Sequence, residues 1–150
     1  MTNKQFLAHL KRIGACEEAV TWVREHGGTP AELWRDCTRG DWMNWLLVHD
    51  QKKLGVTKPQ LVGALADCAA LSLKYFEAEY PDDKRVRKCI NTCRKYAQGK
   101  ATGEELENAS SAASAATYAA YAYAHIPYYK KLARCANILR KHFPNLLDEL

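Results

Sequence analysis

The feature that most constrains the fold is a long apolar stretch, residues 57–80, which a proline ends. Thr57 and Gln60 stand three residues apart, as in a capping box, so a helix is expected to begin there. Apolar residues then cover nearly the whole helical circumference, which predicts a central helix with neighbours on several sides. Pro81 lacks an amide hydrogen and pushes Tyr80 out of the α region, so the helix is expected to end there.

A second, basic helix is expected over residues 83–98, with Asp82 as its cap. Residues at steps of three and four would face the core, opposite a solvated face that carries Arg87. Arg85 lies at the edge of the buried face, where a guanidinium needs a carboxylate. Its candidate partners are Glu77, Asp82 and Asp83. A Glu77–Arg85 pair would either lock the helix junction or belong to a binding site, and the sequence leaves both open.

The other segments also predict helices. Thr2, Thr29 and Thr102 each precede a Gln or Glu by three residues. Asp41 is expected to cap a helix that continues to about Leu54, and the last helix is expected to reach Phe143 and leave a short tail. Because no stretch shows strand alternation between hairpin turns, we expect an all-α fold. The prediction is a compact single-domain bundle of about seven or eight helices over residues 1–150, in which an extension, 1–55, packs on a core, 56–144.

Composition and motifs restrict the function. The net charge of +5 only mildly favours an anionic partner. The first residues form no secretory segment and no apolar run reaches the roughly 20 residues of a membrane span, so a cytoplasmic protein with six reduced cysteines is expected. No GxSxG, GxxxxGK[ST], CxxC or HExxH motif occurs. We therefore expect no enzyme, no cofactor, no metal site and no specific nucleic-acid binding.

Two aromatic segments are candidates for binding. Trp42 and Trp45 lie on one helical face and are either core anchors or half of an aromatic site. Residues 109–124 are almost wholly Ala, Ser and Tyr, and one face carries Tyr118 and Tyr121. That face is either plain surface or the wall of a cleft that stacks a base or a peptide.

The string Phe76-Glu77-Ala78 with Pro81-Asp82-Asp83 and Arg85, followed by the alanine-rich helix, resembles the bacterial and phage family of putative immunity proteins. The resemblance spans residues 61–136. Residues 16–47, with Arg39-Gly40-Asp41-Trp42 and Trp45, resemble the extension of phage-type members. The resemblance implies a helical, non-catalytic protein that neutralises something.

Two functions follow as hypotheses. In the first, the chain binds and neutralises an effector protein, as a toxin-immunity protein or, if phage-encoded, as an anti-defence inhibitor in the host cytoplasm. Trp42 or Tyr121 together with arginine would then meet the partner. In the second, the chain sequesters an anionic nucleotide signal between two helices. Arg85 and Arg87 would take phosphate, while Tyr118, Tyr121 or Trp45 would stack the base. A homo-oligomer is compatible with either hypothesis.

The binding residues expected from the sequence are Arg39, Asp41, Trp42, Trp45, Glu77, Asp83, Arg85, Arg87, Tyr118 and Tyr121.

Overall fold

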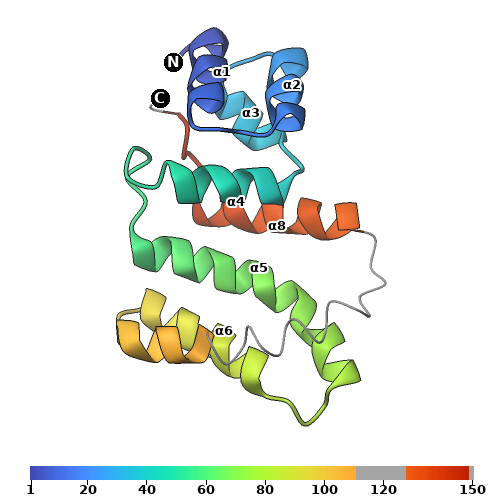
Figure 1. The fold of residues 1–150 in the computed structure, drawn as a ribbon, viewed down its shortest axis with the longest axis vertical. Helices are drawn as coiled ribbons and strands as arrows, with labels where there is room; N and C mark the ends of the chain where they lie inside the picture. The colour runs from blue at the N-terminus through green and yellow to red at the C-terminus, as the bar shows by residue number, and fades with distance from the viewer. Residues whose placement is uncertain (111–127, 149–150) are drawn as a thin grey trace.

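A computed structural model describes residues 1–110 and 128–148, and within these ranges the chain is all-α with no strand (Figure 1). The labelled helices are α1 (Asn3–Arg12), α2 (Glu17–His26), α3 (Pro30–Asp36), α4 (Gly40–His49), α5 (Lys58–Glu79), α6 (Arg85–Ala97) and α8 (Tyr128–His142). Residues 103–110 are also helical. The predicted all-α bundle is confirmed.

The threonine boxes are confirmed as helix starts. At α1, α3 and α5 the threonine side chain accepts a backbone N–H three residues on, and the Gln or Glu side chain accepts the threonine N–H in return. The same exchange occurs between Thr102 and Glu105, at 2.7 and 3.1 Å. These local pairs satisfy amides that a helix start otherwise leaves without a partner.

The predicted limits of α4 are wrong at both ends. The helix starts at Gly40, so Asp41 lies inside its first turn and does not cap it. The Asp41 carboxylate instead accepts two hydrogen bonds from the guanidinium of Arg39, at 2.9 and 2.7 Å. The helix ends at His49, and turns rather than helix lead to Gly55.

The cap of α6 also differs from the prediction. The helix starts at Arg85, and the carboxylate of Asp83, not that of Asp82, accepts the Arg85 backbone N–H at 3.0 Å. An Asp two residues before the first helical amide reaches it through a local side-chain turn, which explains the shift of the start by two residues.

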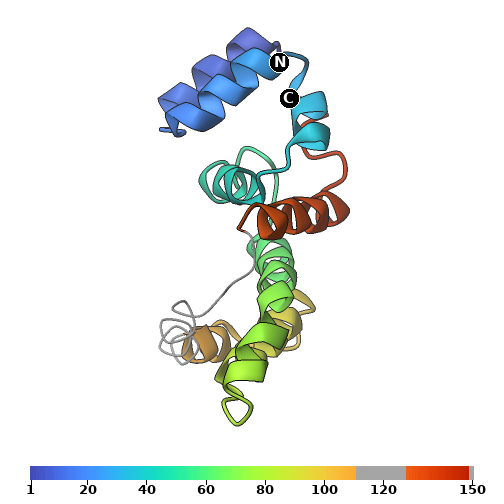
Figure 2. The ribbon, with the colours of Figure 1, turned by 90° about the vertical axis from the view of Figure 1, so that its right-hand side faces the viewer.

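The helices are stacked in layers, and α5 occupies a middle layer, as predicted. Figure 1 and Figure 2 show α6 along one side of α5, with α4 and α8 side by side along the other. Helices α1, α2 and α3 lie beyond α4, so they are furthest from α6. The amino terminus lies at this end of the molecule.

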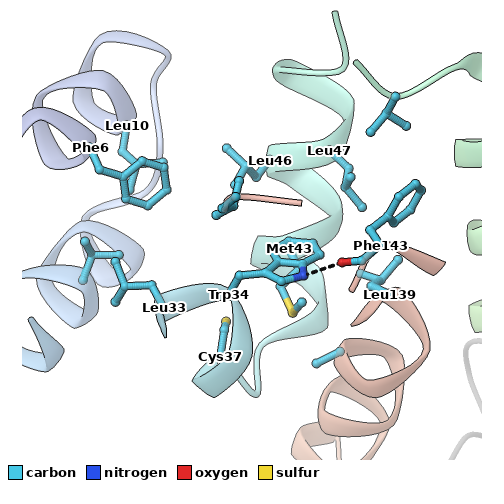
Figure 3. Close-up of a cluster of buried hydrophobic side chains, with 14 of the residues drawn as sticks. Phe6, Leu10, Leu33, Trp34, Cys37, Met43, Leu46, Leu47, Leu139 and Phe143 are labelled. Atoms are coloured by element: carbon cyan, nitrogen blue, oxygen red, sulfur yellow. Dashed lines mark hydrogen bonds between the residues drawn. The ribbon is translucent and has the colours of Figure 1, made fainter. Parts of the chain in front are cut away.

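Residues at the crossing of α4 and α8 belong to the hydrophobic core. Leu47 of α4 and Leu139 of α8 are both fully buried (Figure 3). Gly40 makes the close approach possible, since a Cβ built on it would lie 2.6 Å from the carbonyl oxygen of Leu132 and 2.6 Å from the Cβ of Cys135. The two backbones can approach this closely only because position 40 has no side chain.

Two long-range contacts attach α3 to α8. The indole N–H of Trp34 donates to the carbonyl of Phe143 at 2.9 Å (Figure 3). In return, Arg140 donates to the carbonyls of Trp34 and Cys37, at 3.3 and 2.6 Å. A guanidinium here both completes the hydrogen bonds of the last turn of α3 and places positive charge at its carboxyl end.

The segment after Phe143, expected from the sequence to be a short tail, packs against the core. Leu147 is only 3% exposed and belongs to the same hydrophobic cluster as Leu33 and Leu46. The carboxyl end of the described chain therefore returns to the layer formed by α1, α2 and α3.

A buried polar pair fixes α1 to the end of α4. His9 Nε2 bonds Asp50 Oδ2, and both side chains are buried. Arg12 donates to His9 Nδ1 at 2.8 Å. Because a guanidinium can only donate, Nδ1 is the accepting nitrogen and Nε2 carries the hydrogen given to Asp50.

We predict that Gly40→Ala lowers the free energy of unfolding by about 1–3 kcal/mol, because the new methyl group overlaps the backbone of α8. Urea denaturation followed by circular dichroism measures the change. The matched control is Gly103→Ala, since nothing lies within 4 Å of a Cβ at Gly103. Equal midpoints for the two variants would contradict the close crossing.

Candidate functional site

A pocket of about 410 Å³ lies between the α1–α2 pair, α3 and α4. The amino-terminal helices supply one side and α4 the other, while Leu147 closes part of the wall. A volume in this range suits a small molecule or one or two large side chains of a partner.

Four tryptophans line the pocket, namely Trp22, Trp34, Trp42 and Trp45. Trp34 is buried, whereas the other three are only partly buried. The rings of Trp22 and Trp42 lie 6.1 Å apart at 54°, a tilted arrangement that favours attraction between aromatic rings. The pocket therefore presents large aromatic surfaces that are already ordered.

Histidines stack on two of these tryptophans one helical turn further on. His26 lies on Trp22 with ring centroids 4.8 Å apart, and His49 lies on Trp45 at 4.1 Å. His49 Nδ1 also bonds the carbonyl of Trp45 at 2.9 Å. These contacts hold the two indoles in place without filling the pocket, whose lining includes neither histidine.

Charged groups gather at one part of the pocket. The Arg39 guanidinium lies over the ring of Trp42, 4.2 Å from its centroid, and its two bonds to Asp41 fix it there. Glu18 of α2 approaches the same guanidinium at 3.7 Å. Burial alone would raise the pKa of Asp41, but the hydrogen bonds and charge of Arg39 outweigh it and hold that pKa below its usual value.

Four of the expected residues, Arg39, Asp41, Trp42 and Trp45, thus line one pocket. The indoles of α4 pack against the core cluster and also line the pocket, and their role in an aromatic binding site stays a prediction. Sequence reasoning missed Trp22 and Glu18. Trp22 lies three residues after Ala19, which also lines the pocket, so the helical spacing along α2 could have indicated it.

Four other expected residues lie together where α5 turns into α6, but they pair differently from the hypothesised Glu77–Arg85 contact. Arg87 holds Glu77 with two bonds of 2.5 Å. Arg85 holds Asp83, with contacts of 2.6 and 3.0 Å. Of the three candidate carboxylates, Asp83 is therefore the partner of Arg85. Glu77 instead pairs with Arg87, which was expected on the solvated face and as a phosphate ligand.

The two ion pairs lower the pKa of each carboxyl. Hydrogen bonds from Arg87 lower the pKa of Glu77, and those from Arg85 lower the pKa of Asp83 to about 2. Both guanidiniums are about half exposed, at 52% for Arg85 and 51% for Arg87. Each guanidinium donates to its carboxylate through Nε and Nη2, so an added anion would compete with the carboxylate for these two donors.

Tyr118 and Tyr121, the remaining expected residues, lie outside the described residues. The cleft expected beside them is therefore still a prediction. Trp45 lines the pocket at α4, whereas neither Arg85 nor Arg87 is among the pocket residues.

The cysteines form no metal centre in the described part of the chain, where no group of three or more His, Cys, Asp or Glu could hold an ion. All six are free thiols. Cys89 and Cys93 lie one turn apart on α6 with their sulfur atoms 4.0 Å apart, and burial raises the pKa of Cys93 to about 11. Such a thiol is mostly protonated at neutral pH and packs as a small apolar side chain.

None of the described helices combines the length and the apolar character needed to cross a membrane.

Comparison with known proteins gives one family match. A family model described as "Imm-5 like putative immunity protein" matches residues 56–136, which is more than half of the chain. No curated protein and no solved structure matches this sequence. The matched range contains the Glu77–Arg87 and Asp83–Arg85 pairs, whereas every residue that lines the tryptophan pocket lies outside it.

We predict that the Asp83 carboxyl titrates at about pH 2, and that Arg85→Ala returns its pKa towards the ordinary value of about 3.9. Since the folded-state pKa is the lower one, the pair stabilises the fold above the ordinary pKa, and this stabilisation is lost as pH falls through about 2. Carboxyl ¹³C chemical shifts measure both values. Arg87→Ala is the control, because it should move the pKa of Glu77 and leave Asp83 unchanged.

Proposed function

We propose that this chain, which belongs to the Imm-5 like putative immunity protein family, binds an effector protein and neutralises it. The observation that carries the proposal is the match of the family model to residues 56–136. The pocket supports a protein partner as well, because its tryptophans and Arg39 are the residue types that contribute most to protein–protein affinity.

In the proposed mechanism the chain binds the effector and stays bound, and it catalyses no reaction on it. The charged residues of the pocket hold one another, with Asp41 bound by two bonds to Arg39 and Glu18 beside the same guanidinium. Such an arrangement favours a fixed shape that a partner can bind, and supports neutralisation by covering a surface of the effector. Neutralisation of this kind is stoichiometric, since each molecule of the chain removes one molecule of effector.

The effector is either a toxin, for which the chain is the immunity protein, or a defence component, for which it is a phage inhibitor. In both cases the chain binds the effector. The two cases differ in the kind of effector, and the resemblance of residues 16–47 to phage-type members supports a defence component.

Sequestration of an anionic nucleotide is the alternative hypothesis. Asp83 already accepts from Nε and Nη2 of Arg85, and Glu77 accepts from the same two atoms of Arg87, so a phosphate could use these donors only by displacing a carboxylate. This competition for the guanidinium donors favours a protein partner over an anionic nucleotide.

The test is neutralisation of a defined effector. We expect the immobilised chain to capture one protein from the cytosol of its source, and this protein to impair growth or phage replication when expressed alone. Co-expression of the chain should suppress that effect, and suppression should be complete at about one chain per effector.

Two results would contradict this expectation. Suppression at far below one chain per effector would indicate catalysis, and failure to suppress at a large excess would exclude neutralisation of the captured protein. A chain with Tyr129→Ala, which changes an exposed side chain of α8 outside the pocket, is the control for unrelated surface changes.

A further inference from the structure

We propose that the tryptophan pocket takes an aromatic side chain of the effector that is flanked in the effector sequence by Lys or Arg. This inference rests on the proposed neutralising function and names the chemistry of the segment that the pocket recognises. The family match does not cover the pocket, so the family description does not assign it.

The lining selects an aromatic group. Only three of its nineteen residues are charged, and four are tryptophans. A polar ligand such as a nucleotide would lose its hydrogen bonds to water and find few partners in return. An aromatic side chain would instead stack against ordered indoles and gain free energy from the apolar area that it buries.

The charges select a neighbouring cation. Two carboxylates, Glu18 and Asp41, stand beside one guanidinium, so this group carries one excess negative charge. Both oxygens of Asp41 are held by Arg39, whereas the side chain of Glu18 is 78% exposed. The exposed carboxylate and the faces of the indoles both attract a Lys or Arg next to the inserted ring.

The position of the pocket suits a role in choosing the partner. Its described lining comes from residues 6–46 and from Leu147, and none of it from residues 56–136. Residues 1–55 carry eight Lys and Arg against seven Asp and Glu, so they contribute little of the net charge of +5. Recognition there depends on local complementarity and not on the overall positive charge of the chain.

The probes are three short peptides, Ac-Lys-Trp-Lys-amide, Ac-Glu-Trp-Glu-amide and Ac-Lys-Ala-Lys-amide, added to the ¹⁵N-labelled full chain. The four indole N–H signals report binding, since every tryptophan of the protein lines the pocket. We expect saturable shifts of Trp22, Trp42 and Trp45 with the first peptide. The second should bind about three-fold more weakly at low salt, and the alanine peptide should cause no saturable shift.

Charge reversal at the pocket provides the matched comparison. Glu17 and Glu18 both lie in the first turn of α2 and both are exposed, but only Glu18 lines the pocket. Glu18→Lys and Glu17→Lys therefore remove the same favourable interaction with the helix dipole. Glu18→Lys should reverse the preference between the first two peptides, and Glu17→Lys should preserve it.

Other outcomes overturn the inference. Equal binding of the Lys and Glu peptides, an identical effect of the two variants, or no indole shift each excludes the proposed occupant. Binding of free tryptamine without binding of Ac-Lys-Trp-Lys-amide would make the pocket a small-molecule site instead. A Glu18→Lys chain that has lost the peptide preference but still neutralises the effector would overturn only the proposed role of the pocket. A wild-type chain that does not neutralise the effector would overturn the proposed function.

Discussion

The close crossing of α4 over α8 is the contact on which the rest of the structure depends. Gly40 lets the backbones meet, and the side chains of Leu47 and Leu139 are fully buried beside them. Helix α3 is attached to the carboxyl end of α8 by the hydrogen bonds of Trp34 and Arg140. Because α3 and α4 both supply walls of the tryptophan pocket, the geometry of this crossing also determines the shape of the pocket.

Two parts of the chain differ in their balance of charged residues, and the pocket lies in only one of them. The segment that matches the immunity-protein family contains α5 and α6 and carries twelve Lys and Arg against eight Asp and Glu. The Glu77–Arg87 ion pair joins these two helices. The preceding residues are nearly neutral and build an aromatic pocket. In the proposed function, the family segment provides the scaffold, and the preceding helices provide the surface that distinguishes one partner from another.

Features that depend on neighbouring residues could be predicted from the sequence. The pairs Thr2–Gln5 and Thr57–Gln60 act over three residues, so their spacing alone locates helix starts.

The site could be predicted only in part, because Trp42 and Trp45 share a helix whereas Trp22 reaches them through tertiary packing. Arg140 illustrates the limit, since its carbonyl partner at Cys37 lies 103 positions away and nothing local indicates it. The pairing of Glu77 with Arg87 instead of Arg85 has the same origin, because it joins residues of two helices that lie ten positions apart.

Native mass spectrometry of the chain, purified gently from lysate of its source cells, tests the central claim most directly. If the chain neutralises an effector protein, the spectrum should contain the 17.0 kDa chain with one protein attached in a fixed ratio. A chain that instead retains a small anionic molecule, released as a nucleotide on extraction, would contradict the claim and favour sequestration.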